Sequence, residues 1–266
     1  MPLVTRRRVA AILAALLVGP GLAACTGGPP PVIPTASATP RPASAAETLT
    51  LALALVKGMN CDLTVTQPGQ DSVATGSVNY GTQSAMITSK SRAGNAVISI
   101  EAIEVGPKVW TKIDLGPSNS RLGLNPKKWY LVDQAKLTGV RKKLLDVANY
   151  DVLDMAGLMT STSGLARKDA THITGTVDLT RSTGVSAPTP SDLEKAGLGA
   201  AKIPFTATVD DQGRLIDLLI QADAVDRDLT NEYAFSNIGR PGPVAAPAAA
   251  DVATTPGSVY QIFNGF

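Results

Sequence analysis

Residues 95–113, NAVISIEAIEVGPKVWTKI, point most clearly to the fold class of this chain of 266 residues. Residues 95–105 have the composition of a β-strand. Gly106 and Pro107 then form a turn, and residues 108–113 follow as a second strand. The stretch therefore predicts an antiparallel hairpin.

Similar signals extend on both sides of this hairpin. Residues 59–67 alternate between apolar and polar side chains, residues 73–80 and 83–90 are weaker strands, and residues 128–133 (KWYLVD) form a strand after a loop. Together these segments predict a meander of antiparallel strands. Further strands are predicted at 170–180, 202–209, 214–222 and 228–237.

Two capping motifs predict helices around the strands. Ser44 and Glu47 form a capping box, which predicts a helix over residues 45–57 that is closed by Gly58. Ser191 and Glu194 form another, which predicts a short helix ending at Gly197 or Gly199.

The first helix has a competing interpretation. Leucines alternate with Thr and Ala through residues 49–55, which is the period of a strand. If the segment is a helix, it is apolar nearly all round, and we expect it to be buried on several sides. Residues 138–159 have helical periodicity and predict one broken helix or two, with a break near residues 149–151.

The N-terminal residues 1–24 are predicted to be a lipoprotein signal peptide. Arg6, Arg7 and Arg8 precede an apolar run at 9–18 that is too short for a comfortable membrane span. The sequence Leu22-Ala23-Ala24-Cys25 resembles a bacterial lipobox, in which the cysteine is acylated and becomes the first residue. Cys25 is therefore the predicted lipid anchor, on the outer face of the cytoplasmic membrane. The alternative is an ordinary signal peptide cleaved near Ala24.

The rest of the chain divides into three parts. Residues 25–43 hold the anchor and a Pro-rich tether, which as an extended chain reaches roughly 55 Å. Residues 44–238 form the folded domain, and residues 239–266 are an Ala- and Pro-rich extension with an aromatic end. That end either docks on the domain or forms a sticky tail.

Composition excludes several function classes. The chain has 24 basic and 22 acidic side chains, so no nucleic-acid partner is expected. One histidine and two cysteines exclude a metal site built from several such ligands. His172 falls on the polar face of its strand, and no nucleophile or phosphate-binding motif is present, so we expect no enzyme activity and no cofactor. Nothing in the sequence specifies an oligomeric state.

Three segments carry a resemblance to a known family. They are LLDVANYDVLDMAGLMTSTSGLARKDATHITGTVDLT (144–180), IPFTATVDDQGRLIDLLIQAD (203–223) and YAFSNIGRPGPVAAP (233–247). With the lipobox, the tether and the order of elements, they make the chain similar to the LppX/LprG lipoproteins of actinobacteria. The resemblance implies an α+β fold in which a strongly curved antiparallel sheet forms a half-barrel, like that of LolA and LolB, with helices on its concave face.

The resemblance also implies an apolar cavity that holds the acyl chains of lipids or glycolipids. Apolar residues on the first helix, the strands and the helical insert are the candidate lining. These are Leu53, Val56, Met86, Ile98, Ile100, Leu145, Leu153, Met155, Leu158 and Met159. Two functions follow: a lipid-anchored protein that binds or carries a hydrophobic ligand, or a surface scaffold or sensor with a packed sheet that acts through a protein partner. An acyl chain needs a continuous apolar space of several hundred Å³, so cavity volume separates them.

Overall fold

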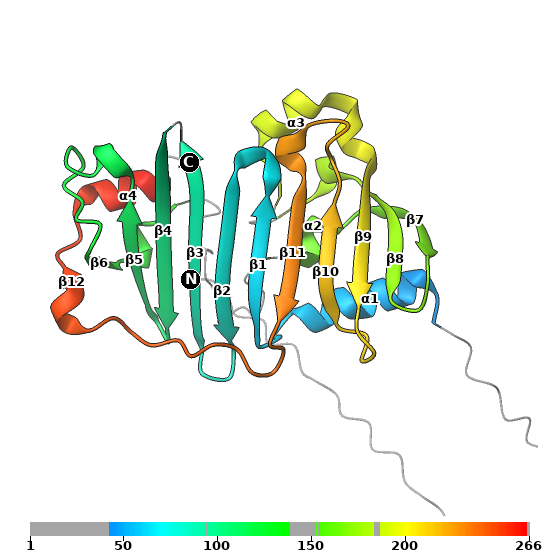
Figure 1. The fold of residues 1–266 in the computed structure, drawn as a ribbon, viewed down its shortest axis with the longest axis horizontal. Helices are drawn as coiled ribbons and strands as arrows, with labels where there is room; N and C mark the ends of the chain where they lie inside the picture. Colours follow the sequence, from blue (N-terminus) through cyan, green and yellow to red (C-terminus); the bar gives the residue numbers. More distant parts are fainter. Residues whose placement is uncertain (1–42, 94, 139–152, 154, 184–186, 265–266) are drawn as a thin grey trace, which may run out of the picture. The chain divides into compact units, whose positions relative to one another are not determined.

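A computed structural model describes residues 43–93, 95–138, 153, 155–183 and 187–264. Residues 42–266 form one compact unit of mixed α and β structure (Figure 1). Its described part is built on a 12-stranded sheet in the order β12-β6-β5-β4-β3-β2-β1-β11-β10-β9-β8-β7. The sheet is open, because β12 and β7 form its two edges and do not pair with each other. The expected α+β class is therefore confirmed.

The predicted strands are present, with bounds shifted by a few residues. They are β1 (Cys61–Gln67), β2 (Ser72–Asn79), β3 (Ser84–Ala93), β4 (Ala96–Val105), β5 (Lys108–Asp114), β6 (Trp129–Val132), β8 (His172–Val177), β9 (Ile203–Val209), β10 (Leu215–Ile220) and β11 (Asn231–Ser236). Strands β1 to β6 form the predicted antiparallel meander. Strand β11 pairs with β1, with Leu63 opposite Phe235, and so joins the meander to the closing strands.

The two edge strands did not follow from the sequence pattern. Strand β7 (Thr162–Arg167) carries few apolar side chains and has a register irregularity between Ser163 and Ala166. Strand β12 (Val252–Ala253) pairs with β6 in parallel. Short or irregular edges of this kind oppose pairing with another chain.

The first predicted segment is a helix, so its interpretation as a strand is wrong. Helix α1 (Ala45–Val56) begins with the predicted capping box. The Glu47 backbone N–H donates to Ser44 Oγ at 3.2 Å, and the Ser44 backbone N–H donates to Glu47 Oε2 at 2.7 Å. These two bonds satisfy backbone donors that a helix start leaves free.

The other α-helices are short. Helix α2 (Met155–Leu158) is the described part of the predicted insert, and α4 (Gly257–Asn264) lies in the C-terminal extension. Helix α3 (Pro190–Ala196) is capped by Thr189 and Asp192, so the capping box predicted at Ser191 and Glu194 is wrong. Proline is favoured at the first position of a helix, and Pro190 therefore moves the start towards Thr189.

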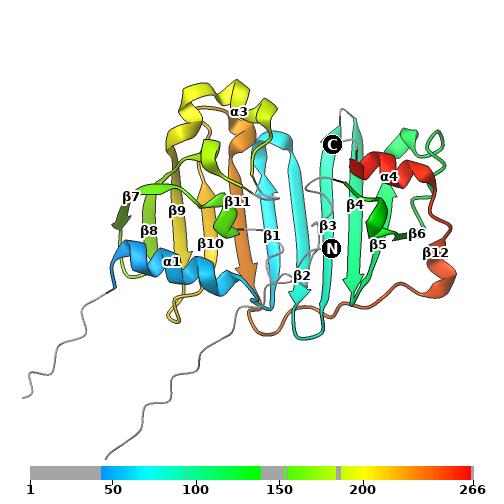
Figure 2. The ribbon, with the colours of Figure 1, turned by 180° about the vertical axis from the view of Figure 1, so that it is seen from behind.

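The sheet has an apolar inner face and a more polar outer face. Register puts Leu63, Val78, Leu218 and Ile173 on the inner face, where they join the buried core. Helices α1 and α4 lie over this face, at opposite ends of the sheet (Figure 2). Thus α1 covers the end of the sheet from β7 to β11, and α4 covers the β4–β6 end.

The C-terminal extension docks on the domain. We call residues 237–256 the C-terminal strap. Asp62 fastens the strap to the outer face, because its carboxylate accepts hydrogen bonds from Asn237 Nδ2 at 2.6 Å and from the Gly242 N–H at 2.8 Å. The strap runs past the ends of β2–β5 to the edge strand β12 (Figure 1). There Thr255 Oγ1 donates to the Leu131 carbonyl at 2.6 Å, and beyond it Val259 of α4 is buried in the core.

Candidate functional site

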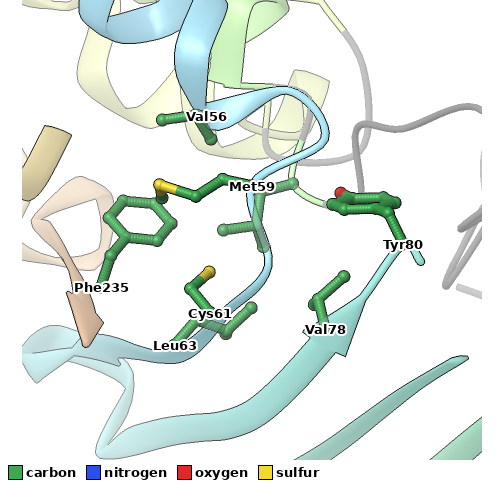
Figure 3. Close-up of a pocket in the computed structure, with 8 residues that line it drawn as sticks. Val56, Met59, Cys61, Leu63, Val78, Tyr80 and Phe235 are labelled. Atoms are coloured by element: carbon green, nitrogen blue, oxygen red, sulfur yellow. The ribbon is translucent and has the colours of Figure 1, made fainter. Parts of the chain in front are cut away.

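A small apolar pocket lies between α1 and the middle of the sheet (Figure 3). The Met59 side chain extends towards the Phe235 ring, with Val56 of α1 on one side and the sheet residues on the other. The complete lining is Val56, Met59, Cys61, Leu63, Val78, Tyr80, Leu153 and Phe235. The cavity measures about 10 Å³, which is close to the space that one water molecule needs.

The pocket is chemically inert. Burial, and to a lesser degree the charge of Asp62, raise the pKa of the Cys61 thiol to about 12. A thiol with that pKa is protonated at neutral pH and is a poor nucleophile. Cys61 therefore acts as a small hydrophobic side chain, as its position in the alternating segment predicted.

A second apolar surface continues from the pocket along the inner face. We call it the inner strip, and it lies on β1–β4 between the ends covered by α1 and α4 (Figure 2). Its side chains share one face by register, and all are partly exposed. They are Val65, Ala74, Gly76, Ile87, Ile98, Ile100 and Ala102.

Small residues shape the inner strip. Gly76 lies opposite Leu63 on one side and Ile87 on the other. A β-carbon at Gly76 would meet the Met86 carbonyl oxygen and would lie 2.9 Å from the Ile87 side chain. Glycine is therefore required here for Ile87 to approach β2 closely.

Four candidate lining residues lie at these two surfaces. Val56 and Leu153 line the pocket, and Ile98 and Ile100 belong to the inner strip. Leu53 packs against the core from α1 and is partly buried. Four pocket residues were not predicted, although the alternation along their strands indicates which residues share a face. They are Met59, Leu63, Val78 and Phe235.

Met86 was wrongly expected to line the cavity. It lies opposite Ser77 and Ile103, so its side chain is on the outer face. Met155, Leu158 and Met159 are 0%, 2% and 4% exposed and belong to the packed core. Leu145, the lipobox residues Leu22, Ala23 and Ala24, the anchor Cys25 and the tether up to residue 42 lie outside the described residues.

An open, more polar groove lies at the β5–β6 end of the sheet. It measures about 400 Å³ and is lined by Pro107, Lys108, Leu131, Val132, Asp133, Gln134 and Ala135. The neighbouring Asp133 N–H donates to Tyr260 Oη at 3.0 Å, so α4 closes the strand edge beside this groove. Its mixed lining gives no continuous apolar wall.

The polar clusters of the described part are structural. His172 Nδ1 lies 2.8 Å from the Asp169 carboxylate. Hydrogen bonds from His172 and from the Thr171 and His172 backbone N–H groups lower the pKa of Asp169 well below its ordinary value. The His172 and Asp169 side chains are 40% and 49% exposed, and they stabilise the turn before β8. Within the described ranges, no group of three or more His, Cys, Asp or Glu side chains is arranged to hold a metal ion.

Comparison of the sequence with models of protein families finds no match, and comparison with curated proteins finds none either. Among the helices that the structure describes, none is long and apolar enough to cross a membrane. A function is therefore inferred from the pocket, the inner strip and the sequence features of the N-terminus.

Proposed function

We propose that this protein is a lipid-anchored, extracytoplasmic lipoprotein that binds a hydrophobic ligand, an acyl lipid or glycolipid, on the inner face of its sheet. In this proposal the sheet is a curved half-barrel of the LppX/LprG and LolA type. Cys25 carries the lipid anchor, and the residues before Ser44 tether the domain to the membrane.

The inner strip is the observation that carries the proposal. Its aliphatic side chains Ile87, Ile98 and Ile100 are only partly buried, although they lie on the same face as the packed core. Exposed apolar area of this kind is unfavourable in water and becomes favourable when an acyl chain covers it, by about 25 cal/mol for each Å² removed from water. The strip also adjoins the apolar pocket, so a bound chain can pass from one to the other.

Binding by this route requires side chains to move. The pocket of about 10 Å³ holds no acyl chain, so Met59 or Leu153 must be displaced for a chain to enter. Methionine has three rotatable bonds and no branch, and it repacks at low cost. An acyl chain would then occupy the strip first and the pocket second.

The small volume of the pocket also favours the second candidate function. A scaffold or sensor protein needs a packed sheet and no interior space, and a cavity of about 10 Å³ agrees with this. The two functions predict different contents in the purified protein.

Native mass spectrometry of the full chain, extracted from the membranes of its own host, tests the proposal. A lipid bound in stoichiometric amount, and released on denaturation, is the expected result. A chain without lipid, also after incubation with mixed host lipids, refutes ligand binding and leaves the scaffold function.

The membrane anchor has a separate test. Cys25→Ser removes the thiol that would receive the lipid, and we expect the variant to leave the membrane fraction or to retain its uncleaved leader. Correct processing and membrane retention of Cys25→Ser would refute the lipobox.

A further inference from the structure

Helix α1 leaves a largely apolar stripe exposed between Glu47 and Lys57. Thr48, Leu49, Ala52 and Val56 are buried against the sheet, whereas the opposite side is in solvent. We call that side the exposed α1 stripe, and it consists of Thr50, Leu51, Ala54 and Leu55. Leu51 is 54% exposed and Leu55 is 39% exposed, so the expectation that this helix is buried on several sides is wrong.

The two leucines form a continuous surface. They are four residues apart, which places them on one side of a helix, one turn from each other. The turn between β9 and β10 borders the stripe, since a β-carbon at Gly213 would lie 3.9 Å from the Leu51 side chain, but Leu51 is still 54% exposed. Exposed leucines at this spacing are typical of a helix that meets another apolar surface.

The point at which the N-terminal chain leaves the domain is fixed beside this stripe. Arg167 of β7 donates from Nε to the Ala43 carbonyl at 3.0 Å, and from its guanidinium to the Thr48 hydroxyl. With the capping box at Ser44, these bonds hold the first turn of α1 in place. Leu51 follows Ser44 by seven residues, which is roughly 10 Å along the helix axis.

From this arrangement we propose that the exposed α1 stripe docks on the lipid bilayer to which Cys25 attaches the chain. The inference rests on the anchor proposed above. Residues 26–43 connect Cys25 directly to the start of α1 and reach roughly 55 Å when extended, so the start of the helix stays within that distance of the membrane. Tethering makes docking an intramolecular step, which raises the effective concentration of the membrane at the stripe.

The leucines of the stripe match the apolar interior of a bilayer and not its charged headgroups. The two leucines carry no charge, and the exposed charges at the two ends of the helix, Glu47 and Lys57, are opposite in sign, so docking depends on apolar burial and not on anionic lipids. It therefore occurs on vesicles of neutral phosphatidylcholine and is insensitive to salt. Docking also places one side of the inner face next to the membrane, where a lipid ligand is available.

A fluorescent probe at position 51 tests this inference on the full chain. The acylated protein is inserted in phosphatidylcholine vesicles, part of whose lipids carry bromine on the acyl chains. Leu51→Cys is labelled with an environment-sensitive dye, and Cys61 does not compete, because it is 3% exposed and its pKa is raised to about 12. Val97→Cys is the matched control, since Val97 of β4 is 55% exposed but lies on the outer face.

We expect bromolipids to quench the dye at position 51 several-fold more than the dye at position 97. Leu55→Ser in the Leu51→Cys background should reduce that quenching, without a change in the fold. Equal quenching at both positions in an acylated chain refutes the docking alone. A dye at position 51 that is shielded from aqueous iodide but not quenched by bromolipid identifies a second copy or another protein as the occupant, which also refutes it.

The failure of the anchor is distinguishable from the failure of the docking. Mass spectrometry of the N-terminal peptide reports whether Cys25 is acylated. An unacylated Cys25 refutes the anchor and, with it, the docking.

Discussion

Replacing Leu63 by alanine should open the pocket and strengthen the binding of an acyl chain. Leu63 is 4% exposed and forms part of the pocket wall, so its truncation adds its vacated volume to the existing cavity. The enlarged space is on the order of 100 Å³, which accommodates two or three methylene groups. At about 0.8 kcal/mol for each buried methylene, a fluorescent fatty acid should bind roughly tenfold more tightly or better.

The same substitution should destabilise the domain. Truncating a buried leucine costs about 3 to 5 kcal/mol, of which roughly 2 kcal/mol comes from a cavity of this size at about 24 cal/mol per Å³. For a domain of this length, that loss lowers the melting temperature by roughly 6 to 20 °C. The bound fatty acid fills the cavity and should restore part of this loss.

Leu218→Ala is the matched control. Leu218 of β10 lies on the same inner face and is 0% exposed, but it does not line the pocket. The assay measures the dissociation constant of the fatty acid and the melting temperature of both variants. Equal fatty-acid binding by Leu63→Ala and Leu218→Ala would refute the pocket as the ligand site, because both lose similar stability and only one enlarges the pocket.

Three other predictions concern the sheet, the strap and the buried thiol. Gly76→Ala should destabilise the protein by about 1 to 3 kcal/mol in thermal unfolding, since its β-carbon would meet the Met86 carbonyl oxygen, whereas Gly257→Ala, with nothing within 4 Å, should have little effect. Burial raises the pKa of Asp62, but hydrogen bonds from Asn237, Ser77 and Gly242 outweigh it and hold the pKa below its ordinary value of 3.8. The stabilisation of the strap by Asp62 is therefore present above pH 3.8 and is lost as the pH falls through the lower pKa of the folded state. Asp62→Asn should increase amide exchange in residues 237–247 at neutral pH. Unchanged exchange would contradict this role of Asp62. Cys61 should react with a thiol reagent at pH 8 only after unfolding, and rapid labelling of the native chain would contradict its burial.

Local patterns were sufficient for most of the secondary structure. The hairpin at 95–113 and the capping box at Ser44 depend on residues that are close in sequence, and both are present. The capping box at Ser191 was wrong because Thr189 offers the same pattern two residues earlier and Pro190 favours that start. Strand β7 was missed because an edge strand need not alternate.

The inner and outer faces required long-range information. Residues 85–87 are Ala, Met and Ile, so both faces of β3 carry apolar side chains, and the local pattern does not distinguish them. Pairing of Met86 with Ser77 and Ile103 sets its side chain on the outer face. The pocket likewise joins residues from α1, β1, β2 and β11, which are distant in sequence.

The sequence by itself determined the class of the fold, the meander and the start of α1, because each depends on periodicity or on a few neighbouring residues; the lipobox at residues 22–25 stays a prediction. Only the tertiary structure decided which apolar side chains are core, which line the pocket and which remain exposed on α1. It also decided that the C-terminal extension is fastened at Asp62, runs past the ends of β2–β5 and completes the sheet edge. The physical reason is that burial depends on which distant surfaces meet, and hydrophobicity alone is the same for Leu63 in a pocket wall and for Leu51 in solvent.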